Sequence, residues 1–138
     1  GLIKGDARAF SEKTNTMIEQ SMRQLVKGIC DSHGISYEVK YQTTCPMTFN
    51  QPEQAESATK AAITLLGKDK CDGDIDPRPF SEDFSIMSDT TPGCFVLMGN
   101  GISGSQGMPL HSANYDFNDE LLVKGSSYWV ELAEQQLK

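Results

Sequence analysis

Four places in this sequence have side chains that could do chemistry, and the first is His111. It follows a glycine-rich stretch, residues 99–107, and Asp116 and Asp119 lie a few positions downstream. Neutral imidazole is the commonest metal ligand in proteins, and a nearby carboxylate can fix its tautomer. One histidine does not make a metal site. The residues alone therefore leave two interpretations open, a metal ligand or a loop histidine bonded to the backbone.

The other three places are an acidic pair, an arginine and the glycine-rich loop itself. Glu82 and Asp83 follow a proline-rich loop and could bind a cation, orient a ligand or serve acid–base chemistry. Alternatively, they are acids at a helix N-terminus, where negative charge is favourable. Arg8, flanked by two alanines, could grip a carboxylate through two parallel hydrogen bonds or could face solvent from a strand. The loop of residues 99–104 lacks the context of a dinucleotide-binding fingerprint, so nucleotide binding is rejected.

The elements that must position these residues begin with a strand–helix–strand pattern. Residues 2–10 and 35–41 are predicted to be strands, the second because apolar and polar residues alternate. Between them the spacing predicts a helix that is capped by Ser11, runs to about His33 and is ended by Gly34 in a left-handed conformation. This unit is too small to close a core by itself.

A second part is expected after a break at residues 45–50, the predicted hinge. Pro52 can start a second helix, which ends just before Gly67. A continuous apolar run at residues 93–98 is typical of a strand covered on both faces.

Two shorter signals complete the pattern. Residues 81–88 can form one or two helical turns with Ser81 as the cap. Asn118 can cap the last helix, in which Tyr128 and Trp129 are expected to face inward. Gly125, in the interior of that helix, suggests close backbone packing there.

Composition excludes several classes of function. The net charge of −7, the sequence pI near 4.7 and the scattered basic residues argue against nucleic acid as a partner. No apolar stretch approaches the roughly 20 residues needed to cross a bilayer, and no signal-peptide pattern opens the chain. The four cysteines form no CxxC pair, so we expect reduced thiols in a cytoplasmic protein. Because the chain opens with Gly1 inside a strand pattern, we expect a fragment, a processed product or a trimmed piece.

Several separate motifs, in a consistent order over nearly the whole chain, resemble the hippurate hydrolase and N-acyl-amino-acid amidohydrolase family. The motifs are Gly5-Asp6-Ala7-Arg8-Ala9-Phe10, Pro46-Met47-Thr48-Phe49-Asn50, Phe80-Ser81-Glu82-Asp83-Phe84-Ser85, Pro92-Gly93-Cys94-Phe95, Gly99-Asn100-Gly101, Leu110-His111-Ser112, Tyr115-Asp116-Phe117-Asn118-Asp119-Glu120 and Gly125-Ser126-Ser127-Tyr128-Trp129. The order and spacing of the motifs make the match more specific than any one of them.

The resemblance implies a two-domain metallohydrolase of α+β or α/β class. One domain is an α/β catalytic domain with two divalent metal ions, and the other is a ferredoxin-like lid of βαββαβ type that often mediates dimerisation. In that scheme residues 1–44 are the second half of the lid, a strand–helix–strand piece. Residues 45–138 are the C-terminal part of the catalytic domain.

The resemblance also implies roles for the candidate residues. His111 falls where the family places its last metal ligand, Glu82 and Asp83 fall on an acidic motif beside the substrate, and Arg8 falls where related enzymes hold a substrate carboxylate. The other ligands and the general base belong to upstream segments that this sequence lacks, so it holds no complete catalytic set. The chain alone is expected to be inactive, with two alternatives for the metal, a divalent ion bound or none. Zinc, manganese, cobalt and nickel all suit a site of histidine and carboxylate ligands.

The expected activity of the parent protein is metal-dependent hydrolysis of the amide bond in a small N-acyl amino acid. We expect a homo-oligomer with no membrane or nucleic-acid partner. The alternative is a non-catalytic remnant or an oligomerisation module that kept the fold after losing the metal-binding half. The sequence leaves open which acyl group and amino acid are cut.

Overall fold

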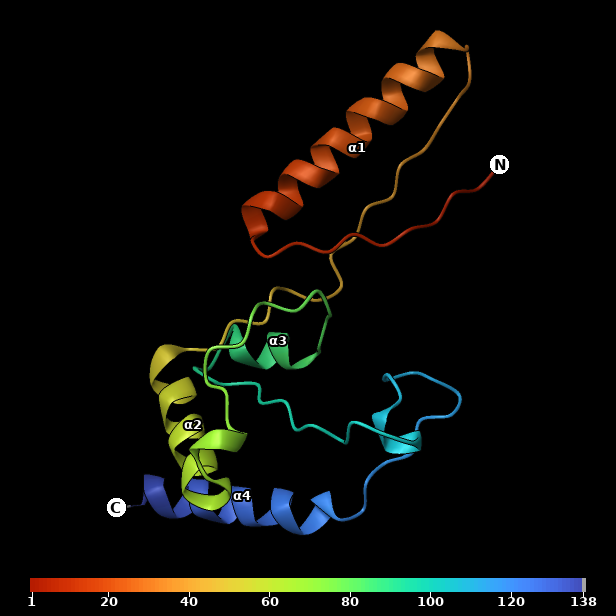
Figure 1. The fold of residues 1–138 in the computed structure, drawn as a ribbon. Coiled ribbons are helices and arrows are strands. Elements are labelled where there is room, and N and C mark those ends of the chain that lie inside the picture. Colours follow the sequence, from red (N-terminus) through yellow and green to blue (C-terminus); the bar gives the residue numbers. More distant parts are fainter. Residues whose placement is uncertain (138) are drawn as a thin grey trace. The chain divides into compact units, whose positions relative to one another are not determined.

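A computed structural model describes residues 1–137, in which helices are joined by irregular segments (Figure 1). The helices are α1 (Glu12–Ser32), α2 (Pro52–Leu66), α3 (Phe84–Ser88) and α4 (Leu121–Gln136), with short 3-10 helices η1 (Lys68–Lys70) and η2 (Ser105–Gly107). The chain forms two compact units. Unit 1 comprises Gly1–Phe49 and Asp76–Gly93, and unit 2 comprises Asn50–Ile75 and the chain from Cys94 onward.

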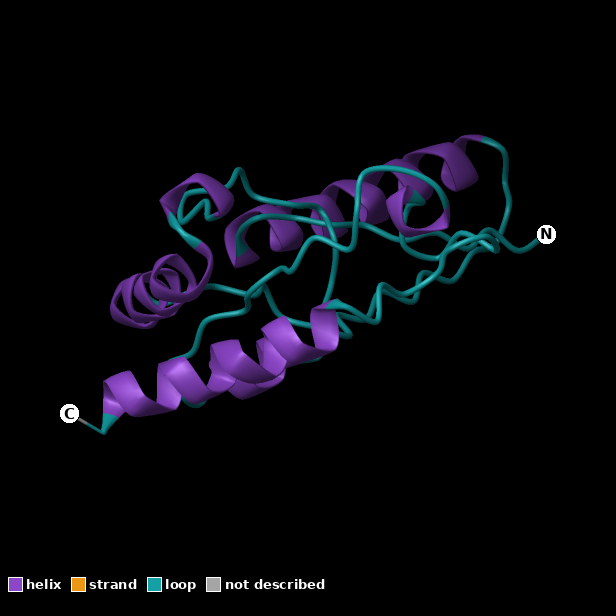
Figure 2. Cartoon of the chain, turned by 60° about the horizontal axis from the view of Figure 1, so that its bottom comes forward, coloured by secondary structure: helices purple, strands orange, loops and turns teal. Residues whose placement is uncertain are grey.

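The predicted α+β or α/β class with a strand–helix–strand lid is wrong, because residues 1–137 contain no strand (Figure 2). Residues 2–10, 35–41 and 93–98 are irregular instead. Their side-chain patterns suit a sheet, but a strand also needs a neighbour that pairs with its backbone N–H and C=O groups. No such ladder forms within the described chain. The division into residues 1–44 and 45–138 rests on the family resemblance and stays a prediction.

Residues 93–98 illustrate what takes the place of a ladder. The Asn50 side chain accepts a hydrogen bond from the Phe95 N–H through Oδ1 at 2.8 Å. Its Nδ2 donates to the Phe95 carbonyl at 3.0 Å. One side-chain amide thus satisfies both backbone groups of a residue, as a neighbouring strand would.

Helix α1 begins and ends where its local sequence predicts. Ser11 Oγ accepts a hydrogen bond from the Thr14 N–H at 3.1 Å, which caps the N-terminus. At the other end Gly34 has a φ of 64°, and the Ile35 N–H donates to the Cys30 carbonyl at 2.9 Å. This is the Schellman arrangement, which favours glycine because glycine has no Cβ to clash in the left-handed region.

The segment after α1 is attached to the helix through side chains. Arg23 Nη1 donates to the Val39 carbonyl at 3.0 Å. Asn15 accepts from the Tyr41 hydroxyl at 2.6 Å and donates to Thr43 Oγ1 at 3.1 Å. These bonds fix the course of the segment without strand pairing.

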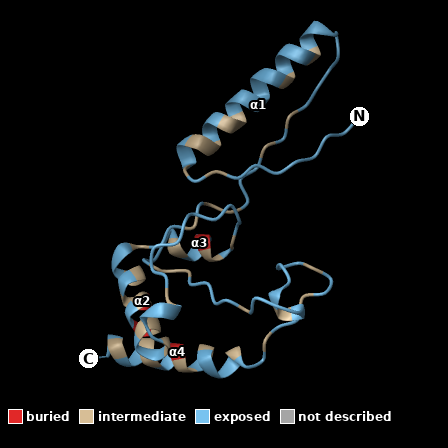
Figure 3. Ribbon diagram, in the orientation of Figure 1, coloured by how far each residue is buried: buried red, intermediate tan, exposed pale blue. Residues whose placement is uncertain are grey.

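The small core of unit 2 lies where α2 packs on α4 (Figure 3). Ala58, Ala61 and Tyr128 are buried there, and the Tyr128 hydroxyl donates to the Ala58 carbonyl at 3.4 Å. Alanine side chains leave room for the tyrosine ring, so the two helices can approach each other. Pro52 opens α2 and Gly67, with a φ of 87°, follows its end, as predicted.

Two predictions for the interior of α4 are not met. Trp129 is 65% exposed, so only Tyr128 of this pair faces inward. A Cβ added to Gly125 would lie 3.9 Å from the Met98 Cε, which is ordinary contact distance and shows no close backbone approach. None of the described helices combines the length and apolar character that a membrane span requires.

Candidate functional site

His111 lies in a tight turn in a position that usually belongs to glycine. The Ser112 N–H donates to the Pro109 carbonyl at 3.1 Å, which closes a four-residue turn with His111 in third place. The φ of His111 is 67°, and it is the only positive value at a non-glycine position among the described residues. A type II turn requires a positive φ in this place, and an L side chain there costs roughly 1–2 kcal/mol. Backbone outliers of this kind cluster at functional sites.

The His111 side chain is exposed and its imidazole makes no hydrogen bond within residues 1–137. The structure therefore does not show the backbone-bonded histidine that was the alternative to a metal ligand. Both ring nitrogens are open to a further partner.

The loop that contains His111 is closed by two asparagines (Figure 1, cyan to blue, ahead of α4). Asn100 Nδ2 donates to the carbonyls of Gln106 at 2.9 Å and Asp116 at 2.8 Å. Asn100 Oδ1 accepts from the Asn118 N–H at 2.8 Å, and Asn118 Nδ2 returns a bond to the Asn100 carbonyl at 3.2 Å.

The local sequence does not predict this pair. It predicts Asn118 as a helix cap, but α4 begins at Leu121 with Glu120 at its N-cap, and Asn118 Oδ1 accepts from the Glu120 N–H at 3.2 Å. The available signal was an asparagine at each end of a glycine-containing loop, since asparagine side chains often bond to nearby backbone.

Gly107 shows how closely the loop backbone is packed. A Cβ placed on Gly107 would lie 2.6 Å from the Ile102 carbonyl carbon, too close for any side chain. Ser105 adds a weaker link, because its hydroxyl donates to Asp116 Oδ2 at 3.3 Å. The loop is therefore a defined structure although most of its residues are exposed.

In unit 1 the structure brings Arg8 to the acidic segment. Arg8 Nη1 donates to Ser81 Oγ at 2.8 Å, and Nη2 forms a salt bridge with Asp6 Oδ2 at 3.0 Å. The Arg8 side chain remains 43% exposed. Ser81 was predicted to cap a helix, but it binds Arg8, and α3 has Asp83 at its N-cap without a side-chain capping bond.

Glu82 and Asp83 are held through their backbone. The Glu82 carbonyl accepts from the hydroxyl of Ser85 at 2.6 Å and from its N–H at 3.2 Å, and Ser85 is fully buried. The Asp83 carbonyl accepts from the Ile86 N–H at 3.0 Å. Neither carboxylate has a hydrogen bond or ion pair within residues 1–137, and Asp83 is exposed while Glu82 is half-buried. Both acids are thus available to a ligand.

The predicted residues fall in both units. Arg8, Glu82 and Asp83 belong to unit 1, and His111 belongs to unit 2. In the part of the chain that the structure describes, no three histidine, cysteine or acidic side chains are grouped so that they could hold a metal ion. These residues therefore supply one candidate ligand, whereas a catalytic zinc site uses about three from the protein.

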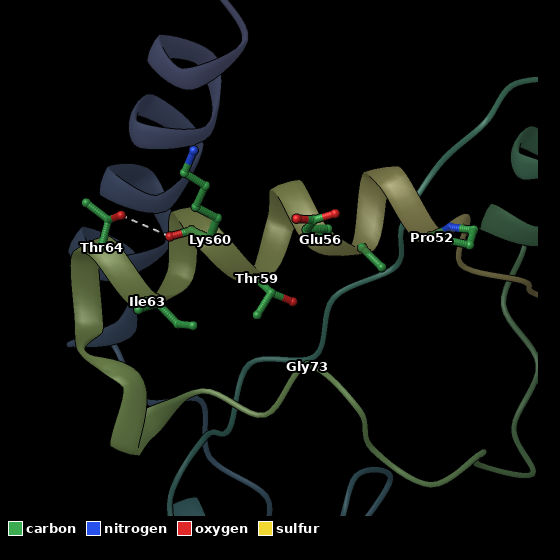
Figure 4. Close-up of a pocket in the computed structure, with 8 residues that line it drawn as sticks. Pro52, Glu56, Thr59, Lys60, Ile63, Thr64 and Gly73 are labelled. Atoms are coloured by element: carbon green, nitrogen blue, oxygen red, sulfur yellow. Dashed lines mark hydrogen bonds between the residues drawn. The ribbon is translucent and has the colours of Figure 1, made fainter.

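A groove of unit 2 has none of the candidate residues in its lining (Figure 4). It has a volume of about 540 Å³ and lies along α2 beside the loop that carries Gly73. A Cβ on Gly73 would lie 2.9 Å from Thr59 Oγ1, so the loop backbone approaches the helix closely. Glu56 and Lys60 are the charged groups of its lining, which contains no histidine or cysteine. The groove therefore offers few side chains that could catalyse a reaction or bind a metal ion.

Cys94 and Tyr128, both in unit 2, are two groups whose acidity the fold changes. Burial raises the pKa of the Cys94 thiol. Burial also raises the pKa of Tyr128, and repulsion from a Cys94 thiolate adds to the effect. A thiol with a raised pKa stays protonated at neutral pH, which argues against Cys94 as a nucleophile.

Comparison with known proteins identifies the group to which this chain is related. Over 136 residues it is 29% identical to hippurate hydrolase of Campylobacter jejuni, covering 99% of this chain and 34% of the relative. It is 28% identical over 147 residues to IAA-amino acid hydrolase ILR1-like 2 of Arabidopsis thaliana, covering 99% of this chain and 31% of the relative. The chain thus spans about a third of the length of these relatives. No solved structure gave a significant match. Residues 4–135 match peptidase family M20/M25/M40, which confirms the resemblance seen in the sequence, and the chain belongs to that family.

Proposed function

We propose that this chain is the C-terminal part of a metal-dependent amidohydrolase that cleaves the amide bond of small N-acyl amino acids. The observation that carries the proposal is His111, an exposed imidazole that has no hydrogen-bond partner within residues 1–137 and lies at a strained turn position in a family of hydrolases. The named activities of two relatives, hippurate hydrolase and IAA-amino acid hydrolase, favour an N-acyl amino acid as the substrate class.

In this proposal His111 is one ligand of a divalent metal ion. Its chemistry fits, because a neutral imidazole binds zinc, manganese, cobalt and nickel. When bound, such an ion polarises a carbonyl and activates water. The remaining ligands and the general base would come from the rest of the longer protein, since the described residues hold no further metal group. The chain alone is then inactive.

Arg8 and the acidic segment would form the substrate side of the site. Arg8 can hold the carboxylate of an N-acyl amino acid by two parallel hydrogen bonds, in exchange for its bonds to Ser81 and Asp6. The carboxylates of Glu82 and Asp83 form no hydrogen bond or ion pair within residues 1–137, so they can shape the site or accept substrate N–H groups.

The test is to express the protein from its complete gene and to assay a panel of N-acyl amino acids, hippurate included, with and without a chelator. We expect hydrolysis that the chelator abolishes and that added zinc, manganese, cobalt or nickel restores. Absence of chelator-sensitive hydrolysis across the panel would contradict the proposal. The 138-residue chain, assayed in parallel, should show none.

One observation favours a second function, an oligomerisation module. Large apolar side chains on α1 are exposed, among them Leu25 at 65% and Ile29 at 60%. Exposed apolar patches mark contact surfaces. Gel filtration with light scattering of the chain tests this function, because a stable, compact oligomer supports it and a monomer at low concentration contradicts it.

A further inference from the structure

The loop of residues 101–117 depends on hydrogen bonds at its two ends. Asn100 and Asn118, which flank it, form four hydrogen bonds of 2.8–3.2 Å with each other and with the loop carbonyls of Gln106 and Asp116. Both asparagines are half-buried. Three of the four bonds use the side-chain amide of Asn100, so this residue is the centre of the closure.

Residues 108–115, the middle of the loop, form only local hydrogen bonds with the part of the chain that the structure describes. The Ser112 N–H donates to the Pro109 carbonyl, the Tyr115 N–H donates to the Ser112 carbonyl, and the Asn114 N–H donates to Ser112 Oγ. These bonds define turns, but a positive φ at His111 is costly and persists only where the surrounding structure over-determines it. The Asp116 N–H donates to the Ser105 carbonyl at 3.3 Å, so the asparagine pair shares the closure of the loop with Ser105.

We infer that Asn100 and Asn118 are positioning residues that hold the 101–117 loop so that the His111 imidazole is presented in one orientation to a divalent metal. The inference rests on the proposed function, because it takes His111 as a ligand. Within residues 1–137 neither asparagine forms a hydrogen bond with the His111 ring, so each acts through the loop backbone.

The chemistry of the pair explains why asparagine is required. Asn100 donates twice and accepts once, and only an amide of this length combines these capacities. An aspartate would turn a second acceptor toward the Gln106 and Asp116 carbonyls. An alanine would leave two carbonyls and the Asn118 N–H without their partners.

The experiment uses the protein expressed from its complete gene and compares four variants, Asn100→Ala, Asn118→Asp, His111→Ala and Asn114→Ala. Asn118→Asp is the milder change, because it removes the donor to the Asn100 carbonyl but keeps the acceptor for Glu120. Asn114→Ala is the matched control, an asparagine of the same loop whose side-chain amide has no hydrogen-bond partner within residues 1–137. Metal affinity is measured by competition with a chromophoric chelator. The visible spectrum of the cobalt-loaded protein and the Tm of the metal-free protein are recorded as well.

We expect Asn100→Ala to weaken metal binding by about 10–100-fold and to change the cobalt spectrum, as loss of a ligand-orienting contact does. Asn118→Asp should show a smaller effect in the same direction, and Asn114→Ala should match the parent protein. A lower Tm with unchanged affinity and spectrum would mean a purely structural role and would overturn the inference. If His111→Ala loses metal while both Asn100 and Asn118 variants keep it, the inference fails and the proposed function stands. If His111→Ala changes neither affinity nor spectrum, the ligand assignment fails and the inference with it.

Discussion

Arg8 Nη1 donates a hydrogen bond to Ser81 Oγ at 2.8 Å, although 73 positions separate the two residues in the chain. This bond places a guanidinium next to the start of the acidic segment of Glu82 and Asp83. Two motifs that are distant in the sequence thus bring a positive side chain and two negative side chains to one region of unit 1. A carboxylate ligand would compete with Ser81 and Asp6 for the same donors.

The first prediction concerns Arg8. Arg8→Lys in the protein expressed from its complete gene should raise the KM for an N-acyl amino acid about tenfold or more, because lysine cannot form two parallel bonds to a carboxylate. Steady-state kinetics measures the change. Arg23→Lys is the control, since Arg23 has a similar side-chain exposure of 45% and lies on α1 in a salt bridge with Glu19. An equal rise in KM for both variants would argue against a specific role for Arg8.

A second prediction separates strain from ligation at His111. Glycine adopts a φ of 67° without a steric penalty, whereas alanine does not. Metal-free His111→Gly should therefore be more stable than His111→Ala by about 0.5–1 kcal/mol, the left-handed penalty less the extra chain entropy of glycine. Urea unfolding gives the difference. Both variants should bind less metal than the parent protein, and equal stability would show that the turn is not strained.

The third prediction uses two glycines, Gly107 in the 101–117 loop and Gly99 just before it. Gly107→Ala should destabilise the protein by about 1–3 kcal/mol, because the new Cβ would lie 2.6 Å from the Ile102 carbonyl carbon. Gly99→Ala is the matched control, since a Cβ there meets nothing within 4 Å. Thermal unfolding of the two variants should separate them clearly. Similar Tm values would mean that the loop is not packed as described.

The fourth prediction concerns pH. Burial raises the pKa of Cys94 from the ordinary thiol value of 9.0, so the folded chain holds the proton more tightly than the unfolded chain. This contribution to stability is fully present below pH 9 and is lost as the pH rises through the folded-state pKa of Cys94. Burial also raises the pKa of Tyr128, so its contribution to stability likewise falls as the pH rises. Free energies of unfolding measured between pH 7 and pH 10 should fall above pH 9.

Removal of Cys94 provides the control for that pH dependence. Cys94→Ala should lessen the loss of stability above pH 9, because the variant lacks the thiol whose pKa is raised by burial. Cys71→Ala, which removes a thiol elsewhere in unit 2, should keep the pH dependence of the parent protein. A decline unchanged by Cys94→Ala would show that other groups cause it.

The sequence predicts the ends of α1 and α2 correctly, but it does not predict the strands correctly. Ser11, Gly34, Pro52 and Gly67 mark helix ends in the sequence, and the structure confirms each, because caps and glycine turns depend on neighbouring residues only. The strands predicted at residues 2–10, 35–41 and 93–98 are wrong. Alternation of apolar and polar residues indicates which face a strand would bury. A strand forms only when its backbone N–H and C=O groups pair with another segment, which is distant in the chain.

The candidate site shows the same division. The residue types of Arg8, Glu82, Asp83 and His111 and their motif order were sufficient to identify the family, and the match over residues 4–135 confirms it. Their roles stay predictions. The sequence did not indicate that Arg8 meets Ser81, that Asn100 and Asn118 close the loop, or that His111 occupies a glycine position. Those relations join residues up to 73 positions apart or depend on a backbone angle.

The sequence by itself therefore determined the ends of α1 and α2, the net negative charge and the family, since each follows from local chemistry or from motif order. Only the tertiary structure decided which motifs lie together within each unit, which tyrosine is buried against Ala58 and which asparagines hold the His111 loop. The physical reason is that a hydrogen bond between distant residues depends on the path of the whole chain between them, which no local pattern encodes.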